Sequence, residues 1–168
     1  MGSSLEDKLN NSFWNWFKGS KITDGGNPVV CYHGSKNLDL KSFDLSFTGS
    51  NTDSGMFGKG FYFTLDRSVA STYGGKVLSV FLSIKNPLII NTKEDIPEIL
   101  TPDETLDDMF NSPEKYSEMF REYLIENNFD GVIDNLSVKN QYVALYPDQI
   151  KSTENDGSWD VNDENIFS

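Results

Sequence analysis

Residues 55–73 combine three closely spaced glycines, an aromatic triplet and a helix start, in the order G-M-F-G-K-G-F-Y-F-T-L-D-R-S-V-A-S-T-Y. Glycines let the backbone turn tightly and approach a ligand closely. The aromatic triplet at 61–63 favours a strand, and Asp66 is a suitable N-cap for a helix that carries Tyr73. We therefore expect Tyr62 and Tyr73 to lie close together, one on a strand and one on the following helix.

Two interpretations of this tyrosine pair are open at this point. Two aromatic faces can hold a flat ring between them, and a cationic ring gains electrostatically from their π-clouds. Alternatively, both tyrosines are core residues whose hydroxyls are hydrogen-bonded within the protein. The remainder of the chain decides between these interpretations.

Length and charge limit the kinds of protein that this chain can be. At 168 residues it is long enough for one domain and too short for two typical ones, so we expect a single domain over residues 5–168. The 14 basic and 26 acidic residues give a net charge of -12. Nucleic-acid binders usually carry positive charge that neutralises phosphates, so we expect no nucleic-acid acceptor.

Membrane, metal and cysteine chemistry are also not expected. The sequence has no apolar run of the roughly 18 residues that span a bilayer, and no basic-then-apolar start. We therefore expect a soluble, cytoplasmic protein without a membrane partner. Cys31, the one cysteine, lies in an apolar run and is expected to be a buried small side chain. No Cys/His cluster indicates a metal site.

Short apolar runs alternate with helix signals along the chain, which predicts an α+β domain. Spacings of three and four between apolar side chains predict a helix over residues 5–17, and capping signals predict helices that begin at Thr101 and Ser112. Strands are expected at 29–32, 77–84, 88–90, 131–133 and 142–146, with an edge segment at 149–152. Residues 36–54 are expected to form a long surface loop, and the acidic segment 153–168 to pack on the body.

Three sequence blocks together resemble one superfamily. They are Y-H-G-S at 32–35, G-K-G-F-Y-F at 58–63 followed by Tyr73, and N-Q-Y-V at 140–143. In their order and spacing they resemble the ADP-ribosyltransferases of the diphtheria-toxin and poly(ADP-ribose) polymerase type. The segments W-F-K-G-S-K-I-T-D-G-G-N-P-V-V-C-Y-H-G-S and Y-P-D-Q-I-K-S-T-E-N-D-G are similar, more narrowly, to the ADP-ribosyltransferase domains of phage polyvalent proteins. The resemblance extends from about Phe13 to Ile166.

This resemblance implies a role for each matching residue. His33 would hydrogen-bond the adenosine ribose of NAD, and Tyr62 and Tyr73 would sandwich the cationic nicotinamide ring. The catalytic triad would be completed by Gln141. The resemblance also implies that the Gly34 backbone and the Ser35 hydroxyl would hold the nicotinamide amide. Gly58 and Gly60 would keep thin the wall of the slot between Tyr62 and Tyr73. Phe61 would be a further contact to NAD.

Gln141 departs from the family pattern, because many members have glutamate at this position. An amide can accept a hydrogen bond from a ribose hydroxyl, but it offers no negative charge and takes no proton at neutral pH. The loss of one such electrostatic group commonly costs on the order of 10² to 10³ in rate. Synthesis of poly(ADP-ribose) is therefore not expected. Gln149 is a possible substitute, and Gln141 could also be only an exposed polar residue at the start of a strand.

The resemblance implies a split core of two small, mainly antiparallel sheets with flanking helices around an NAD cleft. We expect mono-ADP-ribosyl transfer from NAD to a macromolecule, with a bacterial host protein as the acceptor. Two alternatives stay open: a catalytically degenerate module that binds NAD or another protein, and an NAD glycohydrolase. Neither the acceptor residue nor the oligomeric state follows from the sequence.

Overall fold

The structure is a computed structural model that describes residues 5–45, 57–100, 113–137 and 140–168. Its helices are α1 (Leu5–Lys8), α2 (Asn11–Phe17), α3 (Arg67–Ser71) and α5 (Pro113–Glu126), with 3-10 turns η2 (Lys93–Asp95), η3 (Glu98–Leu100) and η4 (Pro147–Gln149). Its strands are β1 (Thr23–Asp24), β2 (Asn27–Pro28), β3 (Cys31–Ser35), β4 (Phe61–Thr64), β5 (Lys76–Leu82), β6 (Pro87–Ile90), β7 (Gly131–Asp134), β8 (Gln141–Ala144) and β9 (Ile150–Ser152).

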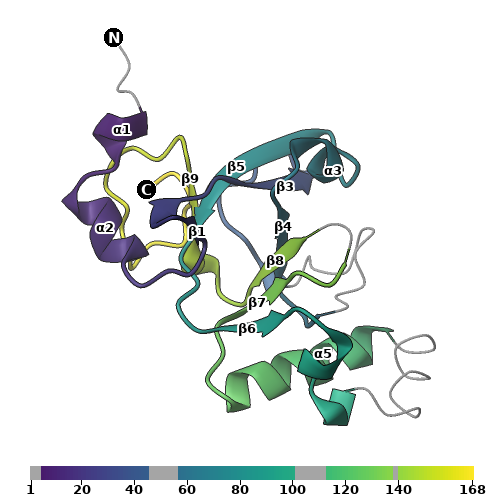
Figure 1. The fold of residues 1–168 in the computed structure, drawn as a ribbon. Coiled ribbons are helices and arrows are strands. Elements are labelled where there is room, and N and C mark those ends of the chain that lie inside the picture. The colour runs from purple at the N-terminus through teal and green to yellow at the C-terminus, as the bar shows by residue number, and fades with distance from the viewer. Residues whose placement is uncertain (1–4, 46–56, 101–112, 138–139) are drawn as a thin grey trace.

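The central feature is a seven-stranded sheet in the order β6-β7-β8-β4-β3-β5-β9, beside a small β1-β2 hairpin. The β6–β7 pair is parallel and the other neighbours are antiparallel. Strands β3 and β4 pair at one position, Tyr32 opposite Thr64. In Figure 1, β3 and β5 lie in one part of the sheet and β6, β7 and β8 in the other, with β4 between them. The predicted mixed fold is confirmed, whereas the expected two sheets are one continuous sheet whose halves meet at this single pair.

Apolar side chains on both faces of the sheet build two cores. One face of β4 and β8 carries Phe61, Phe63 and Ala144 into a cluster with the neighbouring strands. The opposite face carries Val143 against Phe120 and Leu124 of α5. Alternation along a strand places successive side chains on opposite faces, so both cores follow from the same short strands.

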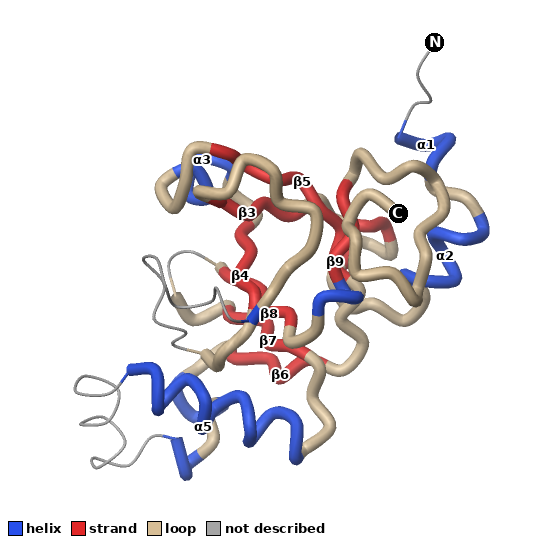
Figure 2. The backbone as a smooth tube through the Cα atoms, turned by 180° about the vertical axis from the view of Figure 1, so that it is seen from behind, coloured by secondary structure: helices blue, strands red, loops and turns tan. Residues whose placement is uncertain are grey.

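A third, aromatic cluster joins the two chain ends. Phe13 and Phe17 of α2 pack with Phe81 of β5 and with Trp159, which is 1% exposed. Figures 1 and 2 place α2 and the C-terminus together near β9, and α5 beside β6 at the other end of the sheet. Residues 153–168 thus lie on the body through Trp159 and through Ile166, which is fully buried.

Several element boundaries differ from the sequence-based expectation for local reasons. The helix expected over 5–17 is two helices, because Asn10 caps α2 by accepting a hydrogen bond from the Phe13 amide at 3.0 Å. Asp66 caps α3 as expected, but α3 ends at Ser71, so Tyr73 follows the helix instead of lying on it. The helix expected from Ser112 is present as α5, and the one expected from Thr101 lies outside the described residues.

The Cys31 thiol provides a simple test of the core. Cys31 is fully buried on β3, and this burial raises its pKa to about 12. Because the thiolate is the reactive form, we expect no reaction with an aromatic disulfide reagent at pH 8 under native conditions. One equivalent of thiol should react after denaturation in guanidinium. Rapid native labelling, measured by absorbance, would contradict this packing of β3.

Within the described ranges, no helix has the combination of length and apolarity that crossing a bilayer requires.

Candidate active site

Three neighbouring strands carry the residues of the expected triad. His33 lies within β3, Tyr62 within β4 and Gln141 at the start of β8. The register places Tyr62 opposite Val143 and Thr64 opposite Gln141. Tyr62 and Gln141 therefore belong to the same face of the β4–β8 pair, one step apart diagonally.

His33 is joined directly to Tyr62. Its Nδ1 lies 2.8 Å from the Tyr62 carbonyl oxygen. A carbonyl only accepts, so Nδ1 carries the proton and Nε2 is the acceptor nitrogen of the neutral ring. The imidazole also contacts the rings of Phe43 and Phe63, at centroid distances of 5.0 and 5.4 Å. This bond holds β3 and β4 together just beyond their one backbone pair.

Burial of the His33 ring lowers its pKa below the ordinary value of 6.5, and the hydrogen bond to Tyr62 opposes that shift. The unfolded chain therefore takes up a proton at a pH where the folded protein does not, and the free energy of unfolding falls as pH drops below about 6.5. We expect the His33 ring signals in proton NMR to titrate with a midpoint below 6.5. Because the chain has one histidine, the assignment is direct, and a midpoint above 6.5 would contradict the buried, neutral ring.

The Tyr62 hydroxyl is engaged by the loop before β4. It donates to the Gly58 carbonyl at 2.6 Å and accepts from the Phe57 amide at 3.0 Å. The ring is half-buried and packs against the core beneath α5. Tyr62 thus has a fixed ring orientation. These bonds also tie residues 57–60, which we call the glycine loop, to that ring.

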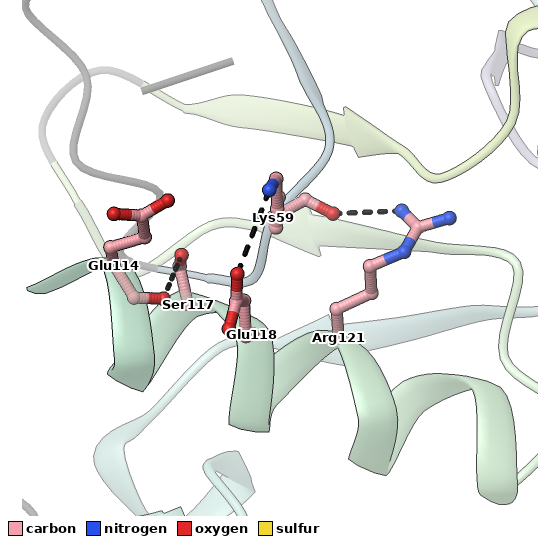
Figure 3. Close-up of polar contacts among 5 residues, drawn as sticks. All are labelled: Lys59, Glu114, Ser117, Glu118 and Arg121. Carbon is pink, nitrogen blue, oxygen red and sulfur yellow. Dashed lines mark hydrogen bonds and ion pairs between the residues drawn. The ribbon is translucent and has the colours of Figure 1, made fainter. Parts of the chain in front are cut away.

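Helix α5 braces the same loop from below, as Figure 3 shows. The Lys59 amide donates to the Ser117 carbonyl at 2.9 Å, and the Lys59 ammonium lies 3.7 Å from the Glu118 carboxylate. Arg121 donates through one nitrogen, Nη1, to the carbonyls of Lys59 at 2.8 Å and Leu145 at 3.0 Å. Arg121 therefore joins the glycine loop to the end of β8. Sequence reasoning missed this role, because nothing in the chain marks which arginine reaches two distant carbonyls.

Gly34 of β3 lies against the backbone of helix α3. A Cβ at this position would be 1.8 Å from the Ala70 carbonyl oxygen and 3.2 Å from the Tyr73 Cβ. Tyr73 is therefore adjacent to Gly34. The nicotinamide slot between Tyr62 and Tyr73 stays a prediction. The Ser35 hydroxyl is nearly buried and bonds the backbone of Asn37, donating at 3.2 Å and accepting at 3.0 Å.

The remaining predicted contact residues also have packing roles. Gly58 adopts a φ of 111°, a conformation that favours glycine. A Cβ on Gly60 would lie 2.7 Å from the Ala144 carbonyl oxygen of β8. Phe61 is 3% exposed and its ring packs on Phe43, so its side chain belongs to the core. Their contacts with NAD stay predictions.

Gln141 and Gln149 occupy different environments. Gln141 is half-exposed and lies between Thr64 of β4 and Asp134 of β7. The Gln149 amide is 6% exposed and makes four hydrogen bonds, the full number that it can form. Its Oε1 accepts from the amides of Leu145 and Tyr146, and its Nε2 donates to the carbonyls of Ser83 and Asp130. Gln149 is therefore a structural residue that joins three loops.

The part of the chain that the structure describes contains no group of three or more His, Cys, Asp or Glu side chains that could hold a metal ion.

Comparisons with known proteins give one family match. The sequence model of a family described as ADP-ribosyltransferase in polyvalent proteins matches residues 23–160. A comparison with curated proteins gave no match. Among solved structures, the chain is similar to the crystal structure of an anti-CRISPR protein, with 15% identity, a TM-score of 0.39 and coverage of 75% of this chain and 94% of that one.

Proposed function

The chain belongs to the family of ADP-ribosyltransferases in polyvalent proteins, and from this membership and the site geometry we propose that it transfers one ADP-ribose unit from NAD to a protein. The observation that supports this most is the 2.8 Å bond between His33 Nδ1 and the Tyr62 carbonyl. It joins the His33 ring to the Tyr62 backbone, and so links the two strands whose residues the resemblance assigns to the two ends of NAD. We further propose that the acceptor is a protein of a bacterial host.

Each side chain has a physical reason for its proposed role. His33 Nε2, the acceptor nitrogen, takes a hydrogen bond from a hydroxyl of the adenosine ribose. The pyridinium ring of NAD lies against the faces of Tyr62 and Tyr73, which favour a cation. The Gly34 backbone and the Ser35 hydroxyl orient the nicotinamide amide, and Gln141 accepts from a hydroxyl of the adjoining ribose.

The proposed reaction breaks the bond between the nicotinamide nitrogen and the ribose carbon. Nicotinamide leaves with the bonding electron pair, and positive charge develops on the ribose. The acceptor's nucleophilic atom then bonds that carbon and loses its proton to solvent or to a base on the acceptor. Gln141 cannot take this proton, so the proposal requires an acceptor that is already a good nucleophile.

Isotopically labelled NAD, incubated with the protein and a bacterial lysate, tests this proposal. Label on a discrete protein band, resistant to boiling in detergent, is the expected result. The variants His33→Ala and Tyr62→Ala should lose at least about 99% of the labelling, since each removes a group that positions NAD. Circular dichroism should confirm that each variant is folded. Unchanged labelling by both folded variants would contradict the site.

Gln141 supports one other candidate function, a module that binds NAD or a partner without chemistry. The same incubation separates the possibilities. Binding of NAD without labelled protein or free ADP-ribose would favour the binding module. Free ADP-ribose without labelled protein would indicate hydrolysis of NAD.

A further inference from the structure

Asp134 is a carboxylate buried directly beside the site. The register of β7 and β8 places it opposite Gln141, in a row that continues to Thr64 of β4. Directly opposed residues share a face of the sheet, with Cβ atoms about 4.5 to 5.5 Å apart. Figure 1 shows the two strands side by side. Asp134 has no exposed surface.

Within the described ranges, the Asp134 carboxylate is held by hydrogen bonds and by no cation. Its Oδ1 accepts from the amides of Leu136 at 2.9 Å and Ser137 at 3.0 Å, and its Oδ2 accepts from the Ser137 hydroxyl. In the ranges that the structure describes, Lys59 and Glu118 form the one ion pair, so no described cation neutralises Asp134. A buried charge is costly unless it is paired. Asparagine could accept the same two amides without that cost, so turn formation alone does not explain the carboxylate.

We propose that Asp134 supplies the negative charge that Gln141 lacks. The inference rests on the proposed function: the charge that develops on the ribose near Gln141 is the cation that Asp134 stabilises. Asp134 does not touch the ribose and takes no proton. It acts through its charge, and its bonds to the amides of Leu136 and Ser137 also shape the turn at 135–137. Position 141 is then neutral because a second carboxylate there would face the first.

Asp134→Asn separates charge from shape, because asparagine keeps the two amide contacts. We expect kcat for NAD turnover to fall about tenfold or more with KM little changed. In a partly screened site, removing a unit negative charge about 8 Å from a developing cation raises the activation free energy by at least the amount that corresponds to that factor. Asp130→Asn is the matched control. Asp130 also caps backbone amides, those of Lys85 and Asn86, at the opposite end of β7, and its variant should keep kcat.

Gln141→Glu tests the pairing in a second way. With Asp134 present it places two carboxylates face to face, so we expect a lower unfolding midpoint in the absence of NAD and no gain in kcat. The double variant Asp134→Asn/Gln141→Glu moves the carboxylate from β7 to the facing position on β8. It should regain the midpoint and reach at least the kcat of the wild type.

The outcomes distinguish failure of this inference from failure of the proposed function. If the wild type turns over NAD and the Asp134→Asn variant has an equal kcat, this inference is wrong and the proposed function is not affected. An equal rise in kcat from Gln141→Glu with and without Asp134 also overturns it. A wild-type protein that neither binds nor turns over NAD would overturn both the proposed function and this inference.

Discussion

Replacing Gly34 with alanine is expected to destabilise the protein by about 3 kcal/mol and to abolish the proposed NAD turnover. The added Cβ would lie 1.8 Å from the Ala70 carbonyl oxygen and 2.9 Å from its carbonyl carbon. Both atoms belong to the backbone of α3, so the helix must move as a unit. Tyr73 follows α3 directly and would move with it. Urea denaturation measures the first effect, and nicotinamide release from NAD measures the second.

Gly75→Ala is the matched control for this prediction. Gly75 lies just beyond α3, and a Cβ there would meet no atom within 4 Å. We expect its unfolding free energy to stay within about 0.5 kcal/mol of the wild type, with turnover unchanged. A Gly34→Ala protein as stable and active as Gly75→Ala would refute the close contact between β3 and α3.

Gly34 and Gly60 also show what sequence reasoning could and could not reach. Motif order identified both as important, and the resemblance assigned them to contacts with NAD. In the fold each has a second reason to be glycine: Gly34 faces the α3 backbone, and Gly60 faces the β8 backbone. A motif records that no side chain fits, but it does not record whether a ligand or a distant strand occupies the space.

Local signals predicted most of the described helices and strands, although several of their bounds differ, and contacts between distant residues account for the rest. The Asp66 cap, the buried run of β5 and the amphipathic α5 all follow from short-range patterns. The break between α1 and α2 depends on the Asn10 cap, a local signal that the continuous apolar spacing concealed. The joined sheet depends on one strand pair, Tyr32 with Thr64, which no short window of sequence specifies.

The candidate site divides in the same way. His33, Tyr62 and Gln141 were predicted from their blocks, because each block carries its own composition, and their roles stay predictions. Arg121 and Asp134 were not predicted, because their places in the fold depend on residues far away in the chain. Arg121 reaches two carbonyls far away in the chain, and Asp134 gains its position from the register of β7 with β8.

Lys151→Met is expected to lower the free energy of unfolding by about 3 kcal/mol. Lys151 lies on β9 with no exposed surface, and its ammonium donates to the carbonyls of Asp163 at 2.7 Å, Asn165 at 3.1 Å and Ser168 at 2.6 Å. Methionine fills a similar volume but removes the ammonium donor from all three carbonyls, of which that of Ser168 keeps a hydrogen bond from the Asp160 amide at 3.3 Å. Because all three belong to the C-terminal segment, that segment should loosen first, and amide hydrogen exchange should show early loss of protection at residues 159–168.

The exposed Lys18 supplies the control, because Lys18→Met removes a charge without removing a buried donor. It should change the unfolding free energy by no more than about 0.5 kcal/mol. Equal stability of the two variants would mean that the three carbonyl contacts contribute little. A large loss for Lys151→Met alone would show that one buried ammonium holds the acidic C-terminal segment against β9. Its hydrogen bonds to three carbonyls and its attraction to the carboxylates of Asp163, Asp160, Asp148 and Asp156 both keep this lysine inside.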